Sequence, residues 1–241
     1  MRRLLPLLLL LGAVAEARES GFALMSPETQ AMQRDDDANP AMLWVEEGRA
    51  LWESAGCSGC HGDVAGMRGV AARYPAFDAA GGGPVDLAGR IAQCQEARQH
   101  RMPFARESGE ALALAALVGL QSRGMPISPP EDPRLAPALA RGEALYRERR
   151  GQLDLSCGQC HDENAGRRLA GSPIPEAHPT GYPLYRLEWQ GMGSLQRRLR
   201  NCMTGVRSEP YAYGAPEYVA IELFLMRRAA GMALETPAVR P

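Results

Sequence analysis

The sequence contains no lysine, so all 27 of its basic residues are arginine. Such a bias follows from codon usage as readily as from function, and arginine content alone indicates no particular chemistry. The 28 acidic residues bring the formal net charge to −1, which argues against the broadly basic surface of a nucleic-acid-binding protein. An apolar run of the roughly 20 residues that a membrane span requires is also missing. We therefore expect no nucleic-acid partner and no membrane span.

The N-terminus has the features of an export signal. Arg2 and Arg3 precede a short apolar run, and a small-residue cleavage site follows at Ala13 to Ala15. We expect residues 1–15 to be a signal peptide that is cleaved on export, which places the mature chain in the periplasm. Residues 16–38 then form an N-terminal extension. A retained N-terminal anchor is the alternative.

Two copies of the pattern C-x-x-C-H account for four of the six cysteines, at Cys57–His61 and Cys157–His161. This pattern is the attachment signature of haem c. Two cysteines three positions apart on a helical turn share one face, so both can form thioethers with the same porphyrin. The attachment residues would be Cys57, Cys60, Cys157 and Cys160, and the proximal iron ligands would be His61 and His161. We therefore expect two covalently bound haem c groups.

Two zinc sites are the alternative to two haems. Zinc would need further pairs of cysteine or histidine ligands. The sequence leaves only Cys94, Cys202, His100 and His178 outside the two motifs. These four residues do not supply such pairs, so haem attachment is the favoured interpretation.

The two motifs lie in an internal repeat. Gly48–Trp52 precedes the first motif, and the matching segment Gly142–Tyr146 precedes the second. Asn39-Pro40 and Asp132-Pro133 each combine an N-cap side chain with a proline at the first helical position. Each half is therefore expected to open with a helix that runs toward its motif.

Each half is also expected to close with a helix. The first of these helices is predicted over residues 109–123, after the N-cap residue Ser108 and before Gly124. The second is predicted over residues 216–230, where it begins at a proline and ends before Gly231. Helices at both ends of each half are typical of small cytochromes c.

Halves of this size that are poor in aromatic residues, which make up 6% of the chain, have thin cores. A covalently held porphyrin would supply the missing apolar surface. Residues 125–133 carry four prolines, and we interpret residues 125–132 as a linker. The predicted fold is therefore all-α, with two tandem class I cytochrome c-like domains at residues 39–124 and 133–241, each around one covalent haem c.

The repeat also relates the two remaining cysteines, because Leu87–Cys94 and Leu195–Cys202 share the pattern L-x-x-R-[IL]-x-x-C. One interpretation is a disulfide between Cys94 and Cys202, which requires Cα atoms within about 7 Å. The other makes each cysteine the distal iron ligand of its own haem. Equivalent positions in two repeats face their own haems, so ligation is favoured.

Methionines compete with these cysteines for iron. Met102-Pro103 resembles the methionine–proline loop that supplies the distal ligand in many small cytochromes c, so Met102 is an alternative to Cys94 at the first haem. Met192 and Met203 are weaker alternatives at the second haem, because methionine usually fills cores.

Several strings outside the haem motifs are more specific than C-x-x-C-H, at residues 20–22, 25–29, 35–37, 119–127 and 185–190. On these strings the chain resembles the SoxA family, the catalytic subunits of the SoxAX cytochromes of sulfur-oxidising bacteria. The resemblance implies an L-cysteine S-thiosulfotransferase, which joins thiosulfate oxidatively to a cysteine thiol of the carrier protein SoxYZ. It also implies a heterodimer with the cytochrome SoxX, which receives the electrons through haem.

By the same resemblance, Cys202 is the catalytic cysteine and forms a persulfide, Cys94 is the thiolate ligand of the first haem, and Arg198 binds substrate. Thiosulfate is a dianion that must approach a thiolate, and a planar guanidinium offsets that repulsion. Arg198 lies four residues before Cys202, which puts both side chains on one face of a helix. Arg207 is a candidate helper.

Arg90 has the same spacing from the cysteine of the first half, where no catalysis is expected. Pairing of both arginines with haem propionates is therefore an alternative to substrate binding. The halves differ in arginine density, because Arg197 and Arg200 replace Gly89 and Ala92. This difference indicates that the second half holds the anion site.

Two other functions remain as alternatives. One is a dihaem electron carrier with no substrate site, against which the arginine density near Cys202 argues. The other is a thiosulfate dehydrogenase that couples two thiosulfates to tetrathionate. An assay for tetrathionate in the absence of carrier protein separates this second alternative from transfer to SoxYZ.

Overall fold

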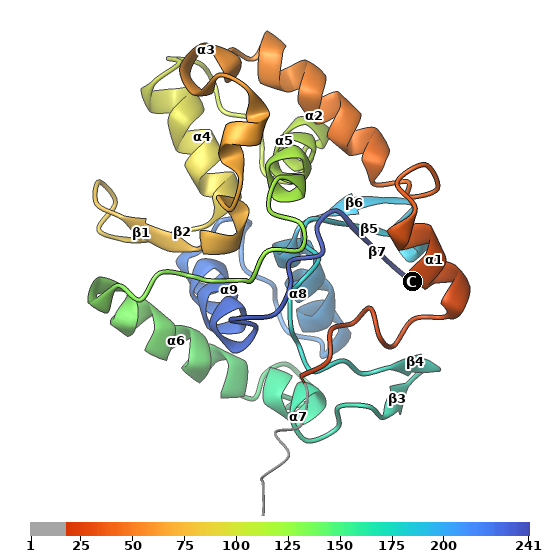
Figure 1. Ribbon diagram of the computed structural model, residues 1–241. Helices are drawn as coiled ribbons and strands as arrows, with labels where there is room; N and C mark the ends of the chain where they lie inside the picture. The colour runs from red at the N-terminus through yellow and green to blue at the C-terminus, as the bar shows by residue number, and fades with distance from the viewer. Residues whose placement is uncertain (1–17) are drawn as a thin grey trace, which may run out of the picture.

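The computed structural model describes residues 18–241 (Figure 1). The predicted signal peptide at residues 1–15 lies outside this range. The α-helices are α1 Pro27–Arg34, α2 Met42–Ser54, α3 Ser58–His61, α4 Leu87–Ala97, α5 Gly109–Leu120, α6 Ala136–Arg147, α7 Cys157–His161, α8 Leu195–Gly205 and α9 Pro216–Arg228. The strands are β1 Ala76–Asp78, β2 Gly83–Val85, β3 Arg168–Leu169, β4 Ser172–Pro173, β5 Leu184–Arg186, β6 Gly191–Gly193 and β7 Ala238–Arg240. In the described range no helix is both long enough and apolar enough to cross a membrane.

Each half is built on one pair of packed helices, α2 with α5 in the first half and α6 with α9 in the second (Figure 1). The glycines that the repeat matches, Gly48 and Gly142, lie at these two contacts. A Cβ atom on Gly48 would overlap the backbone carbonyl of Ala113, and one on Gly142 would overlap the carbonyl of Ala220. Glycine at this position therefore allows the two helix backbones of each half to touch.

We expect Gly142→Ala to lower the free energy of unfolding of the holoprotein by about 3 kcal/mol, the upper end for an overpacked core, because a backbone carbonyl cannot move aside as a side chain can. Chemical denaturation of both proteins measures the difference. Gly109→Ala is the matched control, because a Cβ atom on Gly109 meets nothing within 4 Å. Equal stability of the Gly142 variant and the wild type would contradict the close approach.

The closing helices follow the sequence prediction. α5 begins after Ser108, whose hydroxyl accepts a hydrogen bond from the Ala111 amide at 3.2 Å. α9 begins at Pro216, as predicted. The last residues of both predicted ranges form turns, and these end at Gly124 and Gly231, which have positive φ angles of 80° and 86°. Glycine is favoured in this left-handed conformation.

The opening helices begin later than predicted. α2 begins at Met42, after a turn at Pro40 and Ala41 that the buried Asn39 caps: its side chain accepts from the Ala41 amide at 2.9 Å and donates to the Pro237 carbonyl at 3.1 Å. Asp132 caps a short 3-10 helix that leads into α6. Asn39 therefore caps the turn that leads into α2, as Asp132 does before α6, and its amide also fixes the C-terminal tail.

The all-α prediction is not confirmed, because the described range also holds short strands. β1 and β2 form an antiparallel ribbon before α4, and β5 and β6 form the equivalent ribbon before α8. β7 pairs with β5 in parallel, which gives the order β6-β5-β7, and β3 pairs with β4. Strands of two or three residues are too short to show an apolar–polar alternation, so no pattern in the sequence indicates them.

The predicted linker is held in place by the C-terminal segment. Ile127 is only 1% exposed, and its amide donates to the Met232 carbonyl at 2.8 Å. The Gly231 amide returns a hydrogen bond to the Ile127 carbonyl at 2.8 Å. In the same C-terminal segment, the Leu234 carbonyl accepts a hydrogen bond from the Gly124 amide at 2.7 Å. The segment between the halves is thus part of the packed structure, which its four prolines did not indicate.

The two halves share buried surface. The apolar cluster around α2 and α5 also contains Tyr185 and Met192 from the second half. Trp44 packs edge-on against the Tyr185 ring with centroids 5.8 Å apart. A second cluster gathers around Tyr146 and Tyr218 in the second half. Figure 1 shows α9 between the first half and α6, with α8 beside α9.

Candidate functional site

Each C-x-x-C-H motif forms one short helix, α3 in the first half and α7 in the second. α7 begins with a reciprocal cap: Ser156 Oγ accepts from the Gln159 amide at 3.1 Å, and Gln159 Oε1 accepts from the Ser156 amide at 2.9 Å. Gln159 is one of the two variable residues of the motif, so the motif stabilises its own turn. This turn holds Cys157 and Cys160 on one side of the helix.

His161 is oriented to bind a metal through one nitrogen. Its Nδ1 lies 2.6 Å from the Pro175 carbonyl oxygen, so Nδ1 donates and Nε2 keeps a free lone pair. Burial lowers the pKa of His161, which favours the neutral imidazole that a metal requires. In the first half, the His61 ring lies against Trp52 with centroids 5.8 Å apart, and Trp52 Nε1 donates to the Gly62 carbonyl at 2.9 Å.

The structure places each remaining cysteine beside the motif of its own half. Burial raises the pKa of the Cys57 thiol, and the negative charge of Cys94 raises it further. Burial raises the pKa of Cys157 to about 11, and the charge of Cys202 adds to this rise. Burial and then Cys202 also raise the pKa of Cys160. Each motif therefore has one additional sulfur within electrostatic reach.

The disulfide interpretation is wrong, because Cys94 and Cys202 are both free thiols. The donor set of each half, with two thiols on one helical turn, one histidine and one further cysteine, fits a covalent haem with a nitrogen and a sulfur ligand. Within residues 18–241 no group of three or more His, Cys, Asp or Glu side chains could hold a bare metal ion. The zinc interpretation therefore gains no support.

The methionine alternatives lie in unsuitable environments for iron ligands. The Met102 side chain is 85% exposed, whereas Cys94 is half-buried. Met192 is buried in the core cluster of the first half, away from the second motif's own cluster. Met203 packs in the second cluster, where its sulfur lies 3.4 Å from the Tyr218 hydroxyl. The cysteines are better placed than any of the three.

Two of the α8 arginines that the sequence singled out are engaged by the fold. Arg197 donates to the Met192 carbonyl at 3.1 Å and lies 4.3 Å above the Trp189 ring. Arg200 donates to the Tyr211 carbonyl. Arg207, the candidate helper, contributes only a 3.4 Å hydrogen bond to Gln152. Arginine density therefore does not by itself identify an anion site, because these guanidinium groups are occupied.

The Arg198 guanidinium has no hydrogen bond or ion pair in the part of the chain that the structure describes, although the residue is half-buried. Its positive charge adds to the lowering of the His161 pKa that burial causes, so it lies near the second motif. Its counterpart Arg90 is different, because it pairs with the buried carboxylate of Asp78 at 3.3 Å. The two arginines share a spacing, and only Arg198 is left available for an anion.

Sequence reasoning missed how far the repeat extends. Residues 74–94 and 182–202 correspond without a gap: each begins with Tyr-Pro, continues through a two-stranded ribbon and ends at the distal cysteine. The signal that could have found this is the Tyr-Pro pair, 20 residues before each cysteine. Burial raises the pKa of Tyr182, while the charge of Arg198 lowers it and that of Cys202 raises it. The phenol therefore lies near both groups.

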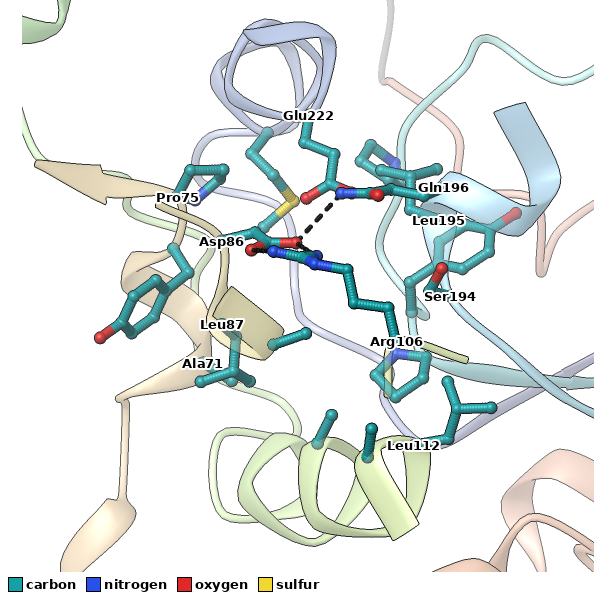
Figure 2. Close-up of a pocket in the computed structure, with 18 of the residues that line it drawn as sticks. Ala71, Pro75, Asp86, Leu87, Arg106, Leu112, Ser194, Leu195, Gln196 and Glu222 are labelled. Atoms are coloured by element: carbon teal, nitrogen blue, oxygen red, sulfur yellow. Dashed lines mark hydrogen bonds and ion pairs between the residues drawn. The ribbon is translucent and has the colours of Figure 1, made fainter. Parts of the chain in front are cut away.

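A cavity of about 120 Å³ lies where the two halves meet (Figure 2). Arg106 pairs with both carboxylate oxygens of Asp86, at 2.6 and 2.8 Å, and Gln196 donates to Asp86 at 3.1 Å. Asp86 caps α4, and Gln196 lies in the first turn of α8. This network, which no motif indicated, ties together the starts of the two helices that carry Cys94 and Cys202.

Glu222 of α9 also lines this cavity, and its buried position predicts a pH-dependent stability. Burial, followed by the charge of Asp86, raises the pKa of Glu222 well above its ordinary value of 4.5. The folded state therefore holds the proton more tightly than the unfolded state does. This stabilisation is complete below pH 4.5 and is lost as the pH rises through the raised pKa.

We therefore expect Glu222→Gln to gain stability relative to the wild type as the pH rises, by up to about 1.4 kcal/mol per pH unit. Unfolding of both holoproteins at a series of pH values from about 4 upward measures this. The exposed Glu209, replaced by Gln, is the control and should leave the profile unchanged. Parallel profiles for wild type and Glu222→Gln would contradict the assignment.

Comparison with known proteins finds a family model, curated relatives and a solved structure that each match most of this chain. A family model described as "SoxA/TsdA, cytochrome c domain" matches residues 46–127 and 141–234, so each matched segment contains one C-x-x-C-H motif. The chain is 34% identical over 228 residues to an L-cysteine S-thiosulfotransferase subunit SoxA of Rhodovulum sulfidophilum, covering 92% of this chain and 79% of the relative. The corresponding subunit of Paracoccus pantotrophus is 31% identical, with 92% and 78% covered. A crystal structure of SoxXA from P. pantotrophus matches with a TM-score of 0.90 at 30% identity, covering 93% of this chain and 87% of that chain.

Proposed function

Because the chain belongs to the SoxA/TsdA cytochrome c family, we propose that it is a SoxA-type L-cysteine S-thiosulfotransferase subunit, which joins thiosulfate to a cysteine thiol in sulfur oxidation. The observation that carries the proposal is the geometry of α8. On one face of this helix, an arginine without a protein partner lies one turn before a half-buried thiol, and the thiol lies beside a haem-attachment motif. This arrangement pairs an anion-binding group with a nucleophile.

The chain would hold two haem c groups, one in each of the two proposed domains. Cys57 and Cys60 attach the first, and Cys157 and Cys160 attach the second. His61 and Cys94 would ligate the iron of the first haem, and His161 and Cys202 would ligate the iron of the second. The hydrogen bond from His161 Nδ1 to the Pro175 carbonyl supports this, because it leaves Nε2 for the iron.

The reaction divides into two balanced steps at Cys202. In the first, the Cys202 thiolate and the outer sulfur of thiosulfate form a sulfur–sulfur bond, and two electrons are released. In the second, the thiolate of the carrier protein attacks that outer sulfur, takes the S-thiosulfonate group and regenerates the Cys202 thiolate. Bound haem c supplies one-electron redox chemistry, so the two electrons leave singly to a redox partner.

Arg198 binds the sulfonate end of thiosulfate during these steps. Two anions must approach each other before the sulfur–sulfur bond forms, and the guanidinium offsets their repulsion. Arg198 is the α8 arginine whose donors remain free within residues 18–241, which supports this role.

The partners we propose are the cytochrome SoxX and the carrier SoxYZ, in the periplasm. The crystal structure to which the chain is similar is titled as SoxXA, which supports the first partner. The two electrons that the reaction releases also require an acceptor, and haem would pass them on one at a time. The carrier supplies the acceptor thiol.

The holoprotein with SoxX, thiosulfate, SoxYZ and an oxidised electron acceptor tests the proposal. Mass spectrometry should show one thiosulfate-derived group on the carrier cysteine, and carrier with a blocked thiol should show none. Tetrathionate formed without carrier would identify a thiosulfate dehydrogenase instead. A protein that exchanges electrons but yields neither product would be a dihaem electron carrier.

A further inference from the structure

The geometry points to Arg186 as a second sulfonate-binding residue beside Arg198, with the carboxylate of Glu188 occupying the anion position until thiosulfate displaces it. This inference rests on the proposed function, because it concerns the substrate of the same site. It comes from a difference in charge between two equivalent positions of the repeat.

In the first half, the position equivalent to Arg186 is occupied by an acidic residue. Asp78, at the end of β1, is buried, and its carboxylate accepts from Arg90 at 3.3 Å and from Gln93 at 2.9 Å. The arginine of α4 is thereby neutralised by its own chain. No anion from outside is needed there, which explains why the L-x-x-R-[IL]-x-x-C pattern alone does not make a substrate site.

The second half reverses that charge. In the ungapped correspondence of residues 74–94 with 182–202, Arg186 at the end of β5 takes the place of Asp78, and Arg198 takes the place of Arg90. The repeat thus sets two guanidinium groups where the first half has an ion pair. Two guanidinium groups close to each other, with no acidic partner between them, favour the binding of an anion.

Glu188 is the anion that the chain itself provides. Its carboxylate accepts from Arg186 Nε at 2.8 Å. That hydrogen bond and the charge of Arg186 lower the pKa of Glu188, and the charge of Arg198 adds to the effect. The carboxylate therefore lies within the field of both arginines.

Glu188 is suited to be displaced, and Arg186 is suited to stay. The Glu188 side chain is 63% exposed and lies in the short helix 187–189, so it can turn into solvent at little cost. The Arg186 side chain is only 18% exposed and lies in the paired strand β5. Thiosulfate carries two negative charges and three sulfonate oxygens, so it can engage both arginines, where the carboxylate carries one charge.

Three variants of the holoprotein test this inference, because two are expected to raise the thiosulfate KM and one is expected to lower it. Arg186→Gln should raise it about tenfold, which corresponds to the loss of one charge-assisted hydrogen bond. Arg186→Asp recreates the charge pattern of the first half and should raise it about a hundredfold. Glu188→Gln should lower it about threefold, because the carboxylate that competes with thiosulfate for the two arginines is gone. If the ion pair were purely structural, removal of either partner would affect thiosulfate binding in the same direction, so the KM would not rise in one variant and fall in the other.

The matched controls are Arg134→Gln and Glu143→Gln, which remove the same charges from exposed ion pairs elsewhere in the second half. Both should leave the thiosulfate KM unchanged. Calorimetric titration of thiosulfate into each variant on a Cys202→Ala background measures binding without turnover. Circular dichroism confirms that each variant is folded.

These measurements separate the two proposals. If the wild type modifies the carrier but Arg186→Asp and Glu188→Gln bind thiosulfate as the wild type does, the role of Arg186 is overturned and the transferase function stands. If the wild type never modifies the carrier while thiosulfate binding still follows the predicted order, the function fails and the anion site stands. An equal loss of binding in both variants would show that the ion pair is structural and would also overturn the inference.

Discussion

Cys202→Ala is expected to abolish transfer of thiosulfate to the carrier thiol while both haems remain covalently attached. The variant lacks the thiol that, within residues 18–241, lies beside the second motif and outside it, so the first sulfur–sulfur bond has no thiolate to form on. The rate should fall at least about a thousandfold, as for the loss of an enzyme nucleophile. Attachment should persist, because Cys157 and Cys160 are unchanged and alanine favours α8.

Carrier mass spectrometry measures the transfer, and haem staining with the mass of the intact chain counts the attached haems. Asn201→Ala is the control, since it introduces the same residue at an exposed neighbouring position of α8. Cys202→Ser separates loss of the thiolate from loss of volume and should be equally inactive. Full transfer activity in Cys202→Ala would end the catalytic assignment of this cysteine.

The parts of the fold that the sequence predicts are those that short-range chemistry decides. Ser108 can cap α5 because the acceptor and the Ala111 amide are three residues apart. Gly124 and Gly231 end turns because their backbone angles suit glycine. In the sequence, Gly48 and Gly142 indicate only that the two halves repeat. In the structure, their lack of a side chain also allows the paired helices to touch.

The parts that the sequence does not predict depend on partners far along the chain. Asn39 caps the turn before α2 as its sequence position predicts, but the sequence does not indicate that its amide also donates to Pro237, 198 residues away. Arg197 and Arg200 look available for an anion, but the carbonyls of Met192 and Tyr211 take their donors. Neither carbonyl has a signature in the sequence, because every residue carries one. Tertiary contacts therefore decide which arginine stays free.

The same reasoning applies to the choice between Cys94 and Met102. The Met-Pro pair resembles a ligand loop in the sequence, and only exposure distinguishes a methionine that faces solvent from one that faces a porphyrin. Met102 is 85% exposed. Cys94 has the half-buried position, on the helix whose start is fixed by Asp86. Burial, rather than the type of ligand atom, therefore favours Cys94 over Met102.

Arg198→Leu is expected to raise the thiosulfate KM about a hundredfold with a smaller change in kcat. Leucine keeps the helix propensity of α8 and removes the one α8 guanidinium without a protein partner in the described range. A charge-assisted, two-pronged contact to an oxyanion accounts for an effect of this size. Steady-state transfer to the carrier at varied thiosulfate concentration separates KM from kcat.

Arg90→Leu is the informative partner of that variant, because it removes the equivalent arginine from the first half. Its guanidinium pairs with Asp78, so its loss should lower the stability of the first half and leave the thiosulfate KM unchanged. If both arginines served only haem propionates, the two variants would change the spectra of their own haems alike and neither would change KM. A KM effect confined to Arg198→Leu therefore requires that one half of a duplicated chain binds substrate while the other neutralises the same arginine from within.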